Sequence, residues 1–166
     1  MSTLHFIYGK PGAGKTRLAR ELAASTPAVP FIEDEWLVSL CDPIETLAQF
    51  AESARRVRTV IAPLATRILE LGASVVFDFA ANTPRDRAWV RSIFEAASAG
   101  HVLHVLDLPD GECRRRVHAR NDAKPVGLYF GHVSDAIFDA VLPHITLPAN
   151  AEGFTVVRHP LAGFPP

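Results

Sequence analysis

The sequence predicts an α/β domain: a five-stranded parallel sheet with helices on both faces. Two observations support this fold class. Short runs of strand-forming residues alternate along the chain with segments of helical periodicity, as in a parallel sheet with crossover helices. A glycine-rich loop of fixed spacing joins the first of these strands to the first helix. The 166 residues fit one such domain, and we expect a single domain over 1–166.

Composition and charge exclude several classes of protein. Hydrophobic content of 48%, charged content of 21% and a net charge of −1 are ordinary for a globular protein. Near-neutral charge disfavours a nucleic-acid partner, because strand binding depends on neutralising several phosphates. The two cysteines and seven histidines show no metal-ligand spacing. No apolar run resembles a signal peptide or a membrane span, so we expect a cytoplasmic protein with no membrane partner.

The glycine-rich loop begins at Gly9, ends at Thr16 and reads G-x-x-x-x-G-K-T. The run 4–8 before it predicts a strand, and the apolar spacing over 15–24 predicts a helix. Glycines let the backbone wrap closely round a phosphate, and N–H groups at the helix N-terminus point at the anion. Lys15 can reach the β- and γ-phosphates, and the Thr16 hydroxyl can bind Mg²⁺. The predicted nucleotide-binding residues are Gly9, Lys10, Pro11, Gly12, Ala13, Gly14, Lys15 and Thr16.

The next segments predict a second strand and a long helix. Residues 30–33 predict the strand, which ends in an acidic run. Residues 44–71 have helical periodicity, and Pro63 within them predicts a kink or two consecutive helices. Gly72 is expected to close this helix in the C′ position.

The second half of the chain repeats the alternation. The apolar run 74–79 predicts a third strand, buried on both faces. Thr83 is expected to cap the next helix, with Pro84 at its first position, and Gly100 is expected to end it.

The fourth strand is predicted over 101–108, and Asp110 is expected to cap the basic helix that follows. Residues 121–131 predict a loop or lid. Together with most of the basic helix before it, this segment makes up the predicted lid, at about 112–131. A further helix follows it, residues 154–157 predict the last strand, and 159–166 predict a surface tail.

Two carboxylates are candidates for chemistry. Asp78 closes the third strand, where it can hold Mg²⁺ or its water beside Thr16. The next residue is Phe79, where a motor ATPase usually carries a water-activating Glu, and this departure disfavours a motor. Asp34 follows the second strand at the edge where ligands bind in open α/β sheets, and it can accept the proton of an attacking hydroxyl. Glu33 and Glu35 compete for this role, and a solvated acidic turn before a helix at Trp36 is an equal alternative.

Arginines of the basic helix are the third candidate. Arg116 and Arg120 are spaced i, i+4, so their guanidinium groups can converge on phosphate oxygens. Stabilising the charge of a transferring phosphoryl group is the largest task in this chemistry. The alternative is a solvated basic face, which we favour for Arg114 and Arg115.

These motifs occur in the same order in a known family. The sequence resembles the small P-loop kinases described as AAA-type ATP-binding domains, which are related to zeta toxins, chloramphenicol phosphotransferase and the kinase domain of polynucleotide kinase. The resemblance covers roughly residues 4–159. It rests on the P-loop, Asp34-x-Trp36-Leu37, the strand ending in Asp78, Cys113-x-x-Arg116-x-x-x-Arg120-Asn121, Pro148 and Glu152-Gly153-Phe154.

The resemblance implies a P-loop NTPase fold of three α/β/α layers with the kinase-like strand order 2-3-1-4-5. It implies that Asp34 is the base on an acceptor hydroxyl. It also implies that Arg116 and Arg120 are lid arginines that contact the nucleotide or its phosphates. The region 148–154 has fewer acidic residues than the family pattern, which leaves its role open. Related kinases place acceptor or phosphate contacts at positions equivalent to Asn82, Thr83 and Arg87.

The sequence therefore predicts a kinase that transfers the γ-phosphate of ATP, with Mg²⁺, to a hydroxyl of a small molecule. A nucleotide-binding switch or slow ATPase that acts through a protein partner is the alternative, and a polynucleotide 5′-hydroxyl kinase is a third. No motif identifies the acceptor or the oligomeric state. Apolar residues after the second strand favour a partly hydrophobic acceptor only slightly, since they could equally belong to the core: Trp36, Leu37, Leu40 and Phe50.

Overall fold

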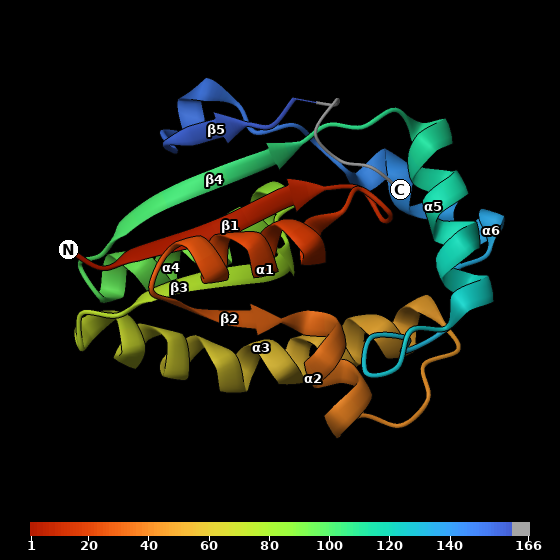
Figure 1. Ribbon diagram of the computed structural model, residues 1–166, viewed down its shortest axis with the longest axis horizontal. Coiled ribbons are helices and arrows are strands. Elements are labelled where there is room, and N and C mark those ends of the chain that lie inside the picture. The colour runs from red at the N-terminus through yellow and green to blue at the C-terminus, as the bar shows by residue number, and fades with distance from the viewer. Residues whose placement is uncertain (161–166) are drawn as a thin grey trace.

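A parallel sheet of five strands forms the centre of the protein, in a computed structural model that describes residues 1–160. The strand order is β2-β3-β1-β4-β5, so the predicted order is confirmed. The carboxyl ends of the strands all lie at the edge of the sheet near α5 and α6 (Figure 1). The strands are β1 (Thr3–Gly9), β2 (Ala28–Ile32), β3 (Ser74–Ala80), β4 (Gly100–Leu106) and β5 (Val156–Arg158).

Helices cover both faces of this sheet, with α1 on one face and α4 on the other (Figure 1). Among the described residues, no helix combines the length and apolar character needed to cross a membrane. The helices are α1 (Lys15–Ser25), α2 (Glu33–Leu40), α3 (Leu47–Glu70), α4 (Pro84–Ala96), α5 (Asp110–Ala123) and α6 (Asp135–Val141), with 3₁₀ turns at Leu142–His144 and Asn150–Glu152.

Alternation along the central strands divides the core into two layers. Phe6 and Tyr8 of β1 pack in one cluster with residues of α3 and α4. Ile7 points to the other face and packs with residues of α1 and α5. Because successive side chains of a strand point to opposite faces, one apolar run supplies both cores. The three-layer arrangement that the sequence predicts is therefore present.

Several helix ends agree with their sequence signals. Gly72 adopts a left-handed φ of 89°, and the amides of Gly72 and Ala73 bond back to Leu69 O and Ile68 O, which closes α3 as predicted. Thr83 caps α4 through a capping box with Asp86, with Pro84 at the first position. The α3 helix is continuous through Pro63, so the alternative of two helices is wrong. One face of α3 is buried from Ala54 to Leu69, on both sides of Pro63, and this packing outweighs the loss of one backbone bond.

Other boundaries differ from the predictions, among them those of α2, α4 and α5. Helix α2 begins at Glu33 rather than at Trp36, so the acidic run forms its first turn. Helix α4 ends at Ala96 because Ser98 takes the left-handed position, and Gly100 is instead the first residue of β4. Asp110 is the first residue of α5 and not its cap, which is Pro109.

The C-terminal half also departs from the predictions, at the end of α5. Helix α5 continues to Ala123, so the predicted loop begins at Lys124 and not at 121. The lid prediction for 112–131 therefore covers most of α5 and the loop after it, and its movement stays a prediction. Of the predicted tail, residues 161–166 lie outside the described residues.

Candidate active site

The glycine-rich loop lies between the end of β1 and the start of α1, against α5. Gly12 has a φ of 80°, and a Cβ placed there would lie 2.3 Å from the backbone oxygen of Cys113. The neighbouring atom belongs to helix backbone, so it cannot move aside as a flexible side chain can. Only glycine fits at this position, and the contact fixes the distance between the loop and α5.

Two lysines hold the loop in its curled shape. Lys15 Nζ donates to Gly9 O at 2.9 Å and to Lys10 O at 3.1 Å, so the ammonium group lies over the loop. Lys10 Nζ donates to Leu108 O at 3.0 Å and to the Asp110 carboxylate at 2.5 Å. The first residues of α5 are therefore tied to the loop by charge as well as by packing.

Asn82 fixes the beginning of the loop. Its Oδ1 accepts from the Gly9 amide and its Nδ2 donates to Gly9 O, each at 3.0 Å. Asn82 also lines the cavity, but both the oxygen and the nitrogen of its side-chain amide are bonded to Gly9. The resemblance implies acceptor or phosphate contacts at this position. The observed bonds show that Asn82 supports the glycine-rich loop (residues 9–16), which we call the phosphate loop from here on.

Thr83 and Arg87 serve the scaffold in the same way. The Thr83 hydroxyl bonds the amide and carboxylate of Asp86 in the α4 capping box. Arg87 is fully buried and binds the Glu152 carboxylate through two nitrogens, at 2.7 and 2.8 Å. This pair anchors the 148–154 region, whose role the sequence left open, to α4.

Asp78 faces the phosphate loop from β3. Thr16 Oγ1 donates to Asp78 Oδ2 at 2.5 Å, and burial raises the pKa of this carboxyl while Lys15 opposes the shift. The strand continues to Ala80 rather than ending at Asp78, and the register of β3 against β1 shifts at this point. Irregular pairing of this kind is common beside active sites because it re-aims side chains.

These two residues also form a donor set that fits Mg²⁺. A hydroxyl and a carboxylate supply hard oxygen ligands, and Mg²⁺ usually takes one or two such protein ligands together with substrate phosphates and water. Within residues 1–160, no group of three or more His, Cys, Asp or Glu side chains could hold a metal ion by itself. The site therefore fits a metal that arrives with a phosphate.

The acidic run at the start of α2 separates into three environments. Asp34 lines the cavity and accepts from Arg120 Nη2 at 2.8 Å. Burial raises the pKa of Asp34 to about 6, although the Arg120 charge lowers it. Glu33 also lines the cavity, burial raises its pKa to about 7, and it pairs with Arg58 at 3.2 Å. Glu35 pairs with a surface arginine outside the cavity, so geometry leaves Asp34 and Glu33 as candidates.

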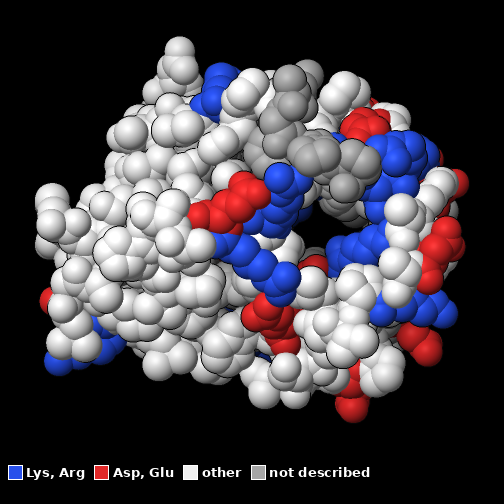
Figure 2. All heavy atoms as spheres, in the orientation of Figure 1, with Lys and Arg blue, Asp and Glu red and all other residues white. Residues whose placement is uncertain are grey.

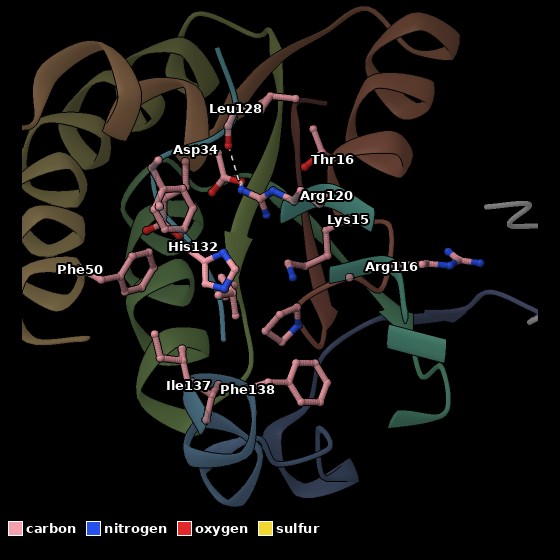
Figure 3. A pocket seen from close by; sticks show the side chains of 18 of the residues that line it. Lys15, Thr16, Asp34, Phe50, Arg116, Arg120, Leu128, His132, Ile137 and Phe138 are labelled. Carbon is pink, nitrogen blue, oxygen red and sulfur yellow. Dashed lines mark hydrogen bonds and ion pairs between the residues drawn. The ribbon is translucent and has the colours of Figure 1, made fainter. Parts of the chain in front are cut away.

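The arginines of α5 have different partners. Arg120 Nη2 also donates to Leu128 O at 2.8 Å, and its guanidinium lies over the Phe130 ring at 5.4 Å. Arg116 donates to Glu112 at 2.6 Å, and Figure 3 shows its guanidinium pointing away from Lys15 and Arg120. Arg120 thus reaches the acidic residues of the site through Asp34, and convergence of both arginines on phosphate stays a prediction.

The neighbouring arginines also differ from each other. Arg115 pairs with Glu112 on the exposed surface, as expected for a solvated face. Arg114 binds Asp135 at 2.7 Å and also Asp139, so it ties α6 to α5 instead.

A cavity of about 550 Å³ opens beside these groups at the carboxyl end of the sheet. Figure 2 shows its mouth as a hollow with Lys and Arg side chains on both sides. The phosphate loop and the acidic residues form one side. Across the pocket lie Phe50 and Ile137 (Figure 3). This second side, which we call the apolar wall, consists of Ile44, Leu47, Phe50, Phe130 and Ile137.

Sequence reasoning did not find the apolar wall as a unit. Its residues come from the α2–α3 connection, the first turn of α3, the loop after α5, and α6. No motif spans these segments, and only tertiary packing brings them together. Phe50 follows the helical apolar pattern of its segment, and that pattern alone does not distinguish a core residue from a cavity residue.

The contact at Gly12 predicts how the loop responds to substitution. Gly12→Ala should lower nucleotide affinity about tenfold or more, because it combines a left-handed φ with a clash against backbone. Gly111→Ala is the matched control, since a Cβ there meets open space. Calorimetric titration of both variants with an ATP analogue measures the effect. Equal affinity in the two variants would contradict the role of the Gly12 contact.

Comparison with known proteins agrees with this geometry. The family model described as an AAA domain matches residues 4–143. No curated protein matches the chain. Among solved structures, a candidate kinase from Chloroflexus aurantiacus J-10-fl has a TM-score of 0.76 at 15% identity, and the match covers 95% of this chain and 86% of that one.

Two further structures are of named kinases. The APS kinase CysC of Mycobacterium tuberculosis, in complex with AMPPNP and APS, has a TM-score of 0.58 at 21% identity, covering 95% of this chain and 88% of that one. A gluconokinase from Sinorhizobium meliloti 1021 has a TM-score of 0.59 at 16% identity, covering 97% of this chain and 85% of that one. These likenesses concern the fold. The chain belongs to the AAA domain family, and its nucleotide-binding fold is that of the small P-loop kinases.

Proposed function

We propose that the protein is a kinase that transfers the γ-phosphoryl group of ATP to a hydroxyl of a small molecule. The observation that supports this most is Asp34, a carboxylate that shares a cavity with Lys15 and whose pKa burial raises to about 6. A general base works best when its pKa lies near the working pH. A carboxylate in such surroundings is suited to removing a proton from an acceptor hydroxyl.

The phosphate side of the site supports the donor half of the reaction. Backbone amides of the loop and of the α1 N-terminus would bind the phosphates, and Lys15 would exchange its loop carbonyls for phosphate oxygens. Thr16 and Asp78 would hold Mg²⁺, which supplies charge neutralisation at the phosphates.

The proposed transfer needs only ATP, the acceptor hydroxyl and the residues of this site. A bond forms between the acceptor oxygen and the γ-phosphorus while the bond from that phosphorus to the β,γ-bridging oxygen breaks, and ADP leaves. Asp34 accepts the hydroxyl proton and later releases it to solvent. Arg120 occupies one oxygen of the Asp34 carboxylate, and its release on nucleotide binding would free both oxygens and make the guanidinium available to the phosphoryl oxygens.

The surroundings of Asp78 count against an ATPase that activates water. Phe79, the next residue, is buried and packs against Phe77 and Trp89. It offers no group that could orient a water molecule. A motor ATPase is therefore disfavoured, and a switch or slow ATPase acting through a partner stays the alternative. A cytoplasmic location stays part of the proposal.

Asp34→Asn tests the base directly. The variant should lower acceptor phosphorylation about 100-fold or more, because the amide cannot take the proton. Affinity for an ATP analogue should be retained or rise, since Asp34 does not belong to the phosphate loop and its loss releases Arg120 for the phosphates. ADP release with a panel of uncharged aryl alcohols, sugars and sugar acids measures the rate.

Glu35→Gln is the matched control for this variant, because Glu35 lies in the same helical turn but pairs at the surface. It should keep its activity within about twofold. If ATP turnover is the same in Asp34→Asn as in the wild type, and no acceptor stimulates it, the kinase proposal fails and the switch is favoured.

The raised pKa of Asp34 predicts the pH profile. The deprotonated carboxylate is the active form, so kcat/KM should rise as pH increases through about 6 and level off above it. A carboxyl with its ordinary pKa would already be fully active at pH 5. Glu33→Gln should leave this acidic limb in place. Loss of the limb in Glu33→Gln would instead assign the base to Glu33, whose pKa lies at about 7.

A further inference from the structure

We infer that the acceptor is an uncharged hydroxyl compound with an apolar, ring-bearing body, and that it binds against Phe50 and Phe130 of the apolar wall. This inference rests on the proposed kinase function and adds the chemical class of the acceptor. It comes from the shape, charge and polarity of the cavity side that faces the phosphate loop.

The two phenylalanines form an aromatic corner. Phe50 lies in the first turns of α3 and Phe130 in the loop after α5, with ring centroids 5.4 Å apart and planes inclined by 31°. Both rings are only partly buried and both line the cavity. Ile44 and Leu47 extend the same surface. An apolar ring placed there would gain contact area and ring–ring contacts without displacing any hydrogen bond.

The distribution of charge disfavours an anionic acceptor. Among the described residues, every Lys and Arg side chain that lines the cavity belongs to α1 or α5. The segments that carry the apolar wall add only His132 and Glu45 as ionisable lining groups. Arg58, behind Glu33, is already bound to Glu33 and Asp86. A carboxylate or phosphate on the acceptor would therefore lie against apolar side chains, and Arg120, the strong cation nearest to Phe130, is already bound to Asp34, so burial of the charge is costly.

Polarity disfavours a sugar for a related reason. The side chains of Ile44, Leu47, Phe50 and Phe130 offer no hydrogen-bond donor or acceptor. A polyhydroxylated body placed against these four side chains would lose its bonds to water and gain none from them. A compound with a single hydroxyl on an apolar body loses little, because that hydroxyl can bond to Asp34.

The position of Phe130 connects this surface to the base. The Arg120 guanidinium lies over the Phe130 ring, and the same guanidinium binds Asp34. An acceptor ring bound against Phe130 is thus separated from the Asp34 carboxylate by the Arg120 side chain alone. The acceptor body and its reacting hydroxyl can occupy the apolar wall and the acidic centre at the same time.

The test compares two probes that share a ring and a hydroxymethyl group. Para-nitrobenzyl alcohol is uncharged and para-(hydroxymethyl)benzoate is anionic, with glucose and gluconate as polar probes. Calorimetric titration, with a non-hydrolysable ATP analogue present, measures binding, and ADP release with ATP measures transfer. The nitrobenzyl alcohol should bind about tenfold more tightly than the benzoate.

Variants assign that binding to the apolar wall. Phe50→Ala and Phe130→Ala should each weaken nitrobenzyl alcohol binding about tenfold, and affinity for the ATP analogue should stay within about twofold. Val126→Ala is the matched control, because Val126 is in the same loop as Phe130 but fully exposed. Thermal unfolding of each variant confirms that it is folded.

The outcomes separate this inference from the proposed function. Binding of the nitrobenzyl alcohol that depends on both phenylalanines, together with transfer, supports both. The same binding without transfer supports the acceptor surface and contradicts the kinase reaction. Preferred transfer to glucose, gluconate or the benzoate supports the kinase reaction and overturns the acceptor class. Absence of nitrobenzyl alcohol binding, or binding unchanged in both variants, also overturns the inference.

Discussion

The close contact between the phosphate loop and α5 is the constraint on which the rest of the site depends. Gly12 meets the backbone of Cys113, Lys10 binds Asp110, and Asn82 holds both polar atoms of Gly9. With the loop fixed on these sides, the N-terminus of α1 has one position. Lys15 and Thr16 follow from it, and Thr16 meets Asp78 on β3. An anion-binding site of this kind needs such rigidity, because its amides must point at the ligand before it arrives.

Buried carboxylates face this rigid donor site. Burial raises the pKa of Glu33, Asp34 and Asp78, and each carboxyl interacts with a basic group that opposes the shift. Both residues of the Asp34–Arg120 pair line the cavity, whereas an ion pair that only supports the fold lies away from a ligand cavity. An incoming nucleotide would compete for Arg120, and Asp34 would then become available to an acceptor. The same electrostatics that holds the empty site together would thus couple donor binding to base availability.

Local signals predicted those parts of the fold that local chemistry controls. The structure confirms the strand–loop–helix unit of residues 3–25, the Thr83 cap and the Gly72 terminus, and the strand order followed from the family resemblance. The end of α4 was missed because Ser98, which has no glycine-like signal, adopts the left-handed conformation. The apolar residues after β2 divide three ways: Leu37 is core, Leu40 is exposed and Phe50 lines the cavity. All three are apolar residues in helical segments, so the sequence pattern does not distinguish them. Contacts with distant segments, such as the loop around Phe130, decide which of them is buried, exposed or at the cavity.

The most direct test of the account is a crystal structure with Mg²⁺ and a non-hydrolysable ATP analogue. The account predicts that the γ-phosphate lies across the cavity from Asp34, with room for one acceptor oxygen between them. It also predicts that Arg120 has left Asp34 and contacts the phosphates. A structure in which the Asp34–Arg120 pair is intact, and in which the γ-phosphate is out of reach of Asp34, would contradict the assignment of Asp34 as the base.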